Sequence, residues 1–269
     1  MTESRMIAAC SIAGSDSGGG AGIQADLKTF TAIGVWGLTV VTAVTAQNTR
    51  EVRGSWMLPA EAVAAQIAAV CDDFSIGAFK TGMLGTREIV RTVAERLPEG
   101  IPLVVDPVMI STSGHRLLDE AAVLDLARFL IPRADVVTPN IPEAEALTGM
   151  AILSLDDMAE AGRRIIDLGA AAVVVKGGHG AGDGVTDMLV DAAGTVRLSG
   201  RRYPYAVHGS GCCFAAALAA YLARGMPLRE AFASARSFVD GAIAAAAGES
   251  GSLRIVNPGG TSFAGEHGR

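Results

Sequence analysis

The chain has 269 residues and a formal net charge of −6; half of its residues are apolar and only 5% are aromatic. An acidic chain without a Lys/Arg cluster argues against nucleic acid or an anionic membrane surface as a partner. It does not argue against nucleotides as ligands, because phosphate sites are built locally from backbone N–H groups. The four cysteines lack metal-site or disulfide spacing, and no signal peptide or membrane span is evident, so we expect a reduced, cytoplasmic protein.

The N-terminal part begins with a short apolar run, 6–13, which ends in the Gly/Ser-rich stretch 14–20. This pattern is typical of a buried strand that enters a loop. The elements expected next are a helix over 21–32 and strands over 35–45 and 52–58.

From residue 59 to residue 176, short apolar strands alternate with helical patterns. The expected elements are an Ala-rich helix opened by Pro59, a strand at 76–80, a helix at 86–96, a strand at 103–105, a helix at 119–130, a strand at 135–137, helices from Pro142 and over 154–168, and a strand at 172–175. Strand, helix and strand at these spacings predict parallel βαβ units in a sheet with helices on both faces.

The pattern changes after Lys176. The segments 185–190 and 195–199 flank a turn at 191–194 and predict an antiparallel hairpin. Helices over 212–224 and 227–247 are expected to close the fold. We found no internal repeat or linker, so residues 1–248 are predicted to form one domain, and the Gly- and Ser-rich tail 249–269 is expected to be loose.

Polar segments follow the predicted strands. Ligands of open α/β sheets bind where strands end and loops begin. Six segments occupy such positions, namely 14–20, 47–48, 80–84, 106–109, 138–143 and 176–179. We therefore expect them to share one edge of the sheet and to form a site there.

The strongest local signal is His208-Gly-Ser-Gly-Cys-Cys213, directly before an Ala-rich helix. Small residues let the backbone approach a ligand, and N–H groups at a helix start point towards an anion. A phosphate or a transferring phosphoryl group would fit there, although on spacing alone a Gly-rich turn before buried small residues fits equally well. Cys212 would lie in the first turn, where the helix dipole favours its thiolate.

Seven segments in order resemble the hydroxymethylpyrimidine/phosphomethylpyrimidine kinases of thiamine biosynthesis, in the ribokinase-like superfamily. They are 13–29, 45–49, 81–84, 106–109, 138–140, 175–179 and 208–212, and the resemblance covers about residues 6–245. Most of the superfamily carry Asp where this chain has Cys212, whereas these kinases and a related group of bacterial pyridoxal kinases carry Cys. The resemblance implies a three-layer α/β fold with a mostly parallel sheet, ATP and Mg²⁺ as cofactors, and a homodimer formed through a sheet edge or a lid.

The resemblance also implies catalytic roles at the predicted helix start. Cys212 would accept the proton of the substrate hydroxyl, and the backbone N–H groups of Gly209, Ser210 and Gly211 would stabilise the transferring phosphoryl group. Taken alone, Cys212 could be a buried inert thiol. Cys213 stands where family members usually have Thr or Ser, and we interpret it as a packing or supporting residue.

Gln47 is predicted to bind the substrate ring. A primary amide can accept from the 4-amino group of an aminopyrimidine while it donates to the ring nitrogen. Asp26 resembles a family residue near the substrate, with a solvated helical carboxylate as the alternative. Gly14, Met83 and Val108 would line the pocket, although Met83 could equally belong to the core.

The remaining candidates concern the nucleotide and the metal. Asn140 and Glu143 form Asn-x-x-Glu, which the superfamily uses to hold magnesium through water; the alternative is a helix cap. Asp106 could support the metal or the attacking hydroxyl, although Asp-Pro is also an ordinary turn. Lys176 is suited to act as a point charge on nucleotide phosphates, with a solvated lysine as the alternative.

By this resemblance, ATP would phosphorylate 4-amino-5-hydroxymethyl-2-methylpyrimidine and then its monophosphate, and the family alone implies the second step. Pyridoxal kinase is the nearest alternative. A dehydrogenase is disfavoured, because 15–17 breaks the Gly-x-Gly-x-x-Gly spacing and no acidic residue follows the second strand. A non-catalytic binding protein would keep Gln47 but lose Cys212, Asn140 or Lys176, and this chain has all of them.

Overall fold

The computed structural model describes residues 6–110, 117–177, 184–248 and 253–260. Within them, nine strands form one sheet in the order β3-β2-β1-β4-β5-β6-β7-β8-β9. The strands are β1 Ala8–Asp16, β2 Trp36–Gln47, β3 Val52–Met57, β4 Ile76–Thr81, β5 Leu103–Val105, β6 Val136–Val137, β7 Ala172–Val175, β8 Gly184–Asp191 and β9 Gly194–Arg201. Neighbours from β2 to β7 pair in parallel, and β3, β8 and β9 add antiparallel pairs at the two ends.

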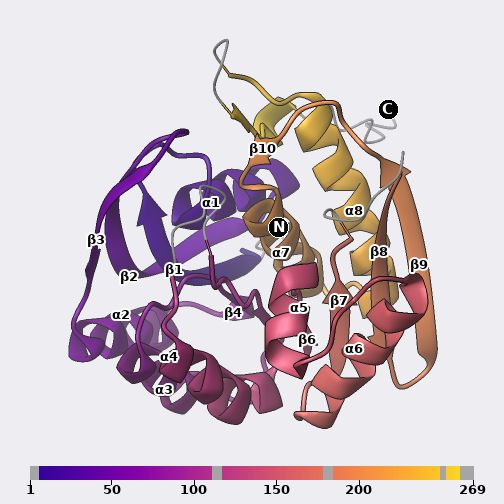
Figure 1. Cartoon of the computed structure of the whole chain (residues 1–269). Coiled ribbons are helices and arrows are strands. Elements are labelled where there is room, and N and C mark those ends of the chain that lie inside the picture. The colour runs from indigo at the N-terminus through magenta and orange to yellow at the C-terminus, as the bar shows by residue number, and fades with distance from the viewer. Residues whose placement is uncertain (1–5, 111–116, 178–183, 249–252, 261–269) are drawn as a thin grey trace, which may run out of the picture.

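Helices cover both faces of this sheet (Figure 1). They are α1 Gly22–Ile33, α2 Ala60–Asp73, α3 Arg87–Arg96, α4 Glu120–Asp125, α5 Ile141–Thr148, α6 Leu155–Asp167, α7 Ser210–Ala223 and α8 Leu228–Ala244, with the short turns η1 Leu126–Leu130, η2 Ile131–Arg133 and η3 Pro258–Gly260. One core lies between the sheet and α2 to α6, and a second lies between the sheet and α1, α7 and α8. The prediction of a three-layer α/β fold is confirmed.

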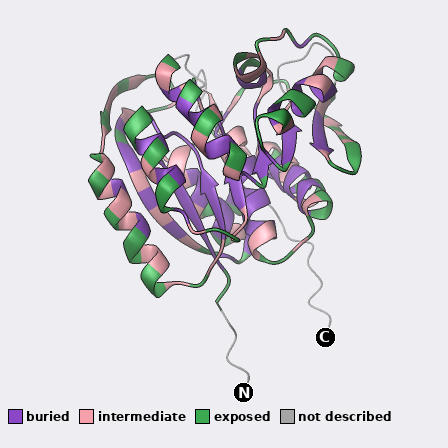
Figure 2. Ribbon diagram, turned by 90° about the horizontal axis from the view of Figure 1, so that it is seen from below, coloured by how far each residue is buried: buried purple, intermediate pink, exposed green. Residues whose placement is uncertain are grey.

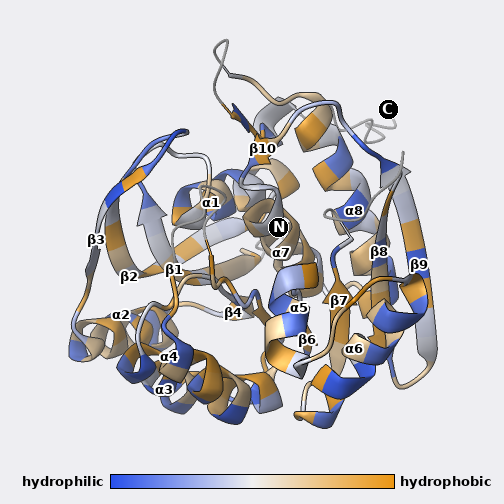
Figure 3. Cartoon of the chain, viewed as in Figure 1, coloured by the Kyte–Doolittle hydropathy of each residue, from blue (hydrophilic) through white to orange (hydrophobic). Residues whose placement is uncertain are grey.

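Burial on both faces explains why the central strands read as continuous apolar runs. In β1, Cys10 and Ile12 belong to the core below α2 to α6, while Ala9 belongs to the opposite core. When helices cover both faces of a parallel strand, the residues on both of its sides are apolar, so the sequence lacks the alternation of polar and apolar residues. Figure 2 shows the strands as the buried centre of the molecule, and Figure 3 shows the same strands as largely hydrophobic.

Helix α7 is buried from Cys213 to Tyr221. Its Ala-rich stretch 215–220 is wholly buried, and the helix packs against α1, α8, β1, β4 and β5. Small side chains let it lie close to the sheet. The sequence at its start therefore faces the central strands.

Two expectations from the sequence need correction. The helix expected over 119–130 is α-helical only to Asp125 and continues as the π-turn η1 and the short helix η2. Pro132 explains this change, since its ring disfavours a regular α-helix in the preceding turn.

The tail is also more ordered than expected. Residues 253–260 include β11 Arg254–Ile255, which pairs in parallel with β10 Val207–His208, and the turn η3. The N–H of Val256 donates to the carbonyl of His208 over 3.2 Å. This part of the tail therefore supports the segment that enters α7; residues 249–252 and 261–269 lie outside the described ranges.

Candidate active site

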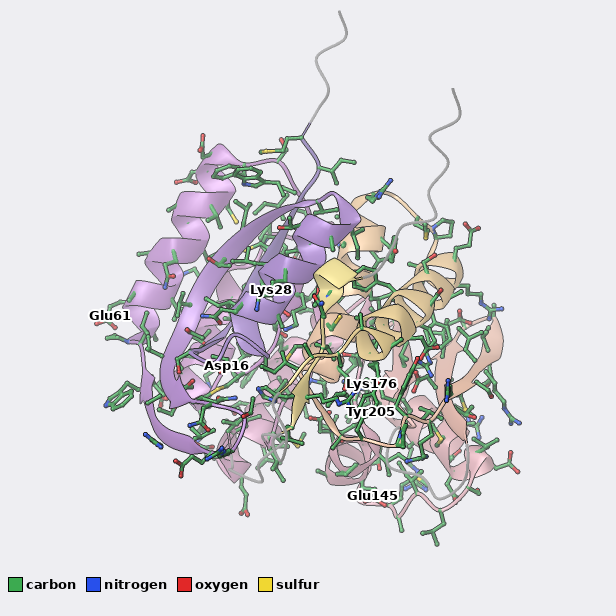
Figure 4. The ribbon with its side chains drawn as sticks, turned by 90° about the horizontal axis from the view of Figure 1, so that it is seen from above. Asp16, Lys28, Glu61, Glu145, Lys176 and Tyr205 are labelled. Atoms are coloured by element: carbon green, nitrogen blue, oxygen red, sulfur yellow. The ribbon has the colours of Figure 1, made fainter. Side chains whose placement is uncertain are left out.

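A cavity of about 1320 Å³ lies at the ends of the strands, and all six predicted polar segments contribute residues to its lining. The predicted site residues that line it are Gly14, Gln47, Met83, Asp106, Val108, Asn140, Glu143, Lys176, Gly209, Ser210, Gly211 and Cys212. Viewed from above, Asp16, Lys176 and Tyr205 lie towards the middle of the molecule, whereas Glu61 and Glu145 lie at its edge (Figure 4). The prediction that these segments meet at one edge of the sheet is confirmed; His179 lies outside the described ranges.

The start of α7 leaves its backbone donors open to the cavity. Gly209 precedes the helix with φ 89°, and a Cβ atom there would lie 1.7 Å from the carbonyl oxygen of Gly20. Only glycine fits this position without displacing the neighbouring backbone. Among the described residues, no side chain caps the helix, so the first N–H groups are available to an anion.

Cys212 stands in this first turn and is half-buried at the cavity wall. Burial raises the pKa of its thiol to about 11, although Lys80 and a hydrogen bond from the N–H of Gly22 act in the opposite direction. The helix start was expected to favour the thiolate, but desolvation outweighs it, and the free protein holds a neutral thiol at pH 7. Cys213 is fully buried against Thr29, in line with a packing role.

Asp26 is the one predicted site residue that does not line the cavity. Its side chain is fully buried, and its Oδ2 accepts from Lys80 Nζ over 2.8 Å and from Ser11 Oγ over 2.5 Å. The alternative of a solvated helical carboxylate is wrong. Asp26 instead holds Lys80, which does line the cavity.

Lys80 was not predicted as a site residue. Burial lowers its pKa, but the carboxylate of Asp26 and the nearby Cys212 and Asp106 outweigh burial and raise it, so the ammonium stays charged beneath the cavity. A lysine inside an otherwise apolar strand was the available signal, because a fully buried lysine needs an acidic partner.

Gln47 ends β2 and lies beside a buried His–Asp pair. Its side-chain amide is 3.2 Å from Nε2 of His208, and that nitrogen is 3.0 Å from Oδ2 of Asp16. Gly14 and Met83 form the adjoining apolar wall, where a Cβ at Gly14 would meet the Met83 sulfur at 3.0 Å. This side of the cavity thus combines one amide with an apolar surface.

Three charged groups gather on the side of β5 to β7. Lys176 Nζ lies 2.9 Å from Asp106 Oδ1, which also accepts from Thr138 Oγ1 over 3.1 Å. The side chain of Lys176 is only 15% exposed, which excludes the solvated alternative. Burial raises the pKa of Glu143 to about 7, and Lys176 offsets part of that rise while Asp106 adds to it.

Asn140 and Glu143 form a capping box at the start of α5. Each side chain accepts from the other residue's backbone N–H over 2.9 Å. The cap does not exclude magnesium, because amide and carboxylate oxygens keep further lone pairs and magnesium prefers such oxygens through water. Two carboxylates, Asp106 and Glu143, share the one ammonium group of Lys176, so the donor set fits an added cation.

Another part of the lining comes from β8, the segment after β9, and α8. Arg236 Nε lies 2.9 Å from Asp187 Oδ2, and Asp187 Oδ1 accepts from the N–H of Gly177. Tyr203 and Tyr205 stand nearby with ring centroids 5.6 Å apart. No short motif marks these residues in the sequence, because they come together only through the fold.

The comparisons with known proteins agree with this geometry. The family profile described as "Phosphomethylpyrimidine kinase" matches residues 16–254. A hydroxymethylpyrimidine/phosphomethylpyrimidine kinase of Rhizobium meliloti is 50% identical over 241 residues, which are 88% of this chain and 91% of that protein.

Two solved structures extend the comparison. The phosphomethylpyrimidine kinase of Clostridium difficile 630 matches with a TM-score of 0.78 and 43% identity, covering 88% of this chain and 99% of that one. The pyridoxal kinase of Staphylococcus aureus in complex with AMP-PCP and pyridoxal matches with a TM-score of 0.87 and 34% identity, covering 96% of both chains.

Among the described residues, no helix has the length and apolar character that crossing a bilayer requires.

Proposed function

Because the chain belongs to the phosphomethylpyrimidine kinase family, we propose that it transfers a phosphoryl group from ATP to 4-amino-5-hydroxymethyl-2-methylpyrimidine, and then another to the resulting monophosphate. The observation that carries this proposal is one cavity that joins the amide of Gln47 to the uncapped start of α7 at Cys212. The first group recognises an aminopyrimidine, and the second receives a migrating phosphoryl group.

In the reaction, the substrate hydroxyl oxygen forms a bond to the γ-phosphorus while the bond from that phosphorus to the β,γ-bridging oxygen of ATP breaks. The N–H groups at the start of α7 stabilise the charge on the transferring group. Because the pKa of Cys212 is about 11, its thiol must first release its own proton to solvent, and Lys80 is the neighbouring cation that favours this ionisation. The resulting thiolate then accepts the hydroxyl proton of the substrate.

Asn140 and Glu143 would hold magnesium through water, with Asp106 in support. The bound ion would neutralise charge on the nucleotide phosphates. Lys176 adds a fixed positive charge beside the same phosphates, and a Cβ at Gly211 would lie 3.3 Å from its Nζ, so it stands next to the start of α7. Removal of the metal by a chelator is expected to abolish turnover.

The direct test supplies the purified full chain with ATP, magnesium and the pyrimidine alcohol, and follows the monophosphate and diphosphate by anion-exchange chromatography. Appearance of both products in sequence supports the proposal. Turnover of the alcohol without the second product would restrict the activity to the first step. No phosphorylation of either compound would refute it.

Pyridoxal kinase is the second candidate, because solved pyridoxal kinases superpose on this chain with TM-scores up to 0.88. The pyridoxal kinases of Staphylococcus aureus and Bacillus subtilis are 34% and 36% identical to this chain, against 50% for the Rhizobium meliloti pyrimidine kinase. We therefore expect pyridoxal to be the poorer substrate. Equal amounts of the two alcohols in one reaction give the ratio of kcat/KM directly, and a preference for pyridoxal would reverse the assignment.

We also infer that the chain forms a homodimer through the β3 edge of the sheet. Trp56 on β3 is 61% exposed, and Val44, its pairing partner on β2, is 48% exposed. Large apolar side chains along an edge strand favour association with another protein surface. Light scattering after size exclusion tests this, and a monomer at micromolar concentration would contradict it.

A further inference from the structure

The amide of Gln47 touches two neighbours whose hydrogen-bonding roles are already determined. Its Nε2 lies 3.2 Å from Nε2 of His208, and its Oε1 lies 3.4 Å from Oγ1 of Thr45. The two ends of an amide have almost the same shape, so the neighbours must decide which end is oxygen and which is nitrogen.

His208 must act as a donor at this position. Its Nε2 lies 3.0 Å from Oδ2 of Asp16, and that carboxylate also accepts from the N–H groups of Gly18, Gly20 and Ala21. Although burial raises the pKa of Asp16, its hydrogen bonds with His208 and the backbone outweigh that effect, so Asp16 is ionised and only accepts. The Nε2 atom of His208 therefore carries a proton in both the neutral and the cationic ring.

Thr45 must act as an acceptor towards Gln47. Its single hydroxyl proton is donated to the backbone oxygen of Ser15 over 2.8 Å. An amide nitrogen facing His208 would thus bring two donors together, while an amide oxygen facing Thr45 would bring two acceptors together. When the amide is turned end for end, its nitrogen donates to Thr45 Oγ1. The single Nε2 proton of His208, which already faces Asp16, is then shared with the amide oxygen in a three-centre hydrogen bond.

Rigid surroundings hold this arrangement. A Cβ atom at Gly20 would lie 2.6 Å from the ring of His208, so that ring is packed tightly against the backbone. The hydroxyl of Ser17 donates to the carbonyl of Gln47 over 2.7 Å and accepts from its N–H over 2.8 Å. Both the amide's backbone and its histidine neighbour are therefore fixed before a ligand arrives.

We propose that Asp16, His208 and Thr45, here called the orienting group, hold Gln47 with Oε1 towards His208 and Nε2 towards Thr45, and that this order determines which way round the substrate ring binds. The inference rests on the proposed function. After these two contacts, the amide keeps one N–H and one oxygen lone pair for the ligand.

The order of donor and acceptor on the amide matters because the substrate ring can form both hydrogen bonds to it in only one orientation. Around the pyrimidine, the ring nitrogen N3, the 4-amino group and the 5-hydroxymethyl group follow one another. With Oε1 on the His208 side, the amino group binds there, and the hydroxymethyl group extends further in the same direction. The chain continues from His208 directly into Gly209 and the first turn of α7, where Cys212 lies. The reverse order would direct the hydroxyl away from Cys212.

The test compares the substrate with its 4-oxo analogue, in which N3 donates and the 4-oxygen accepts. That analogue requires the opposite amide order. For the purified full chain we expect kcat/KM to favour the amino compound on the order of a hundredfold, since one bidentate pair discriminates by roughly 10- to 100-fold.

Two variants each remove one of the contacts that fix the orientation of the Gln47 amide. His208→Phe keeps a ring against Gly20 but removes the donor, and Thr45→Val keeps the shape but removes the acceptor. Each is expected to lower the amino-to-oxo ratio of kcat/KM by about tenfold or more. Thr45→Ser retains the hydroxyl and is expected to keep the ratio. Thr45→Val decides the matter if His208→Phe fails to fold.

The outcomes separate the two claims. A wild-type chain that phosphorylates neither compound refutes the proposed function. A wild-type chain that phosphorylates the amino compound without preferring it over the oxo compound overturns the orienting group alone. If both variants slow the two compounds equally and leave the ratio unchanged, His208 and Thr45 are merely structural and the inference is wrong.

Discussion

Helices α7 and α5 both begin at the same cavity, but their first turns are built in opposite ways. At α7, Gly209 supplies no side chain, and among the described residues none caps the first N–H groups. At α5, Asn140 and Glu143 satisfy each other's backbone in a capping box. An open start offers partial positive charge to an anion, whereas a closed start presents carboxylate and amide oxygens to a cation.

This difference shows that a helix start is not a single kind of site. The residues of the first turn decide the sign of the charge it attracts. In a phosphoryl-transfer cavity the two kinds are complementary, because the same nucleotide brings phosphate anions to one start and a metal ion to the other. The predictions below test each half of this comparison.

The largest effect is expected from Cys212→Ala at the open start. Loss of the proton acceptor should lower kcat by about 100- to 10,000-fold, while binding of the pyrimidine changes little because Gln47 is untouched. A coupled ADP-release assay measures kcat, and calorimetry measures binding. Cys212→Ser with undiminished turnover would show that sulfur is not the base.

Gly209→Ala should have the next largest effect. The added Cβ would lie 1.7 Å from the carbonyl oxygen of Gly20, so the backbone donors must move, and kcat should fall by about 100- to 1,000-fold. Gly225→Ala is the matched control: it also has positive φ, but no atom lies within 4 Å of its added Cβ.

The control should lose about 1–2 kcal/mol of stability through backbone strain and keep its turnover. Thermal unfolding and initial rates of both variants separate strain from catalysis. Equal turnover in the two glycine variants would contradict the role given to the open start.

The sequence predicted most of the fold because its signals are local. Apolar runs buried on both faces gave the strands, and Gly- and Pro-based boundaries gave most helix ends. Of the two exceptions, one is non-local: the strand β11 pairs with β10 some 47 residues earlier. The other is local, because Pro132 was visible in the sequence just after the segment where η1 replaces a regular helix.

The same division holds for the site. Residues in short motifs, such as Cys212 and Gln47, could be predicted from the sequence and do line the cavity. The pairing of Lys80 with Asp26 could not be predicted, because the ion pair joins β4 to α1 and the sequence of neither segment indicates that the two lie in contact. The raised pKa of Cys212 likewise depends on burial, which a motif does not encode.

Asn140→Ala tests the closed start. Loss of the cap should cost about 1 kcal/mol of stability, and release of Glu143 should raise the magnesium concentration for half-maximal rate by about 10- to 100-fold. Ser154→Ala is the matched control, because the side chain of Ser154 also accepts from a backbone N–H of the first turn, at the start of α6, and does not line the cavity. It should lose similar stability without a change in magnesium dependence; equal magnesium curves for both variants would assign Asn140 to capping alone.

The smallest effect concerns the thiol of Cys212 in the free protein. If the open helix start alone ionised it, the thiol would react rapidly with iodoacetamide at pH 8. The raised pKa of about 11, against an ordinary 9.0, instead means roughly a hundredfold less thiolate at that pH. Each thiolate is about tenfold more nucleophilic at the higher pKa, so the net rate should be about tenfold below that of the unfolded chain.

Peptide mapping by mass spectrometry isolates the rate at Cys212 from the other cysteines. Because the folded pKa exceeds the unfolded one, the free energy of unfolding should also decrease between pH 9 and pH 11, where the unfolded chain holds fewer protons on this group. A rate at Cys212 equal to or above that of the unfolded chain would show that the amides of α7 stabilise the thiolate without help from substrate. The open start would then prepare the base as well as receive the phosphoryl group.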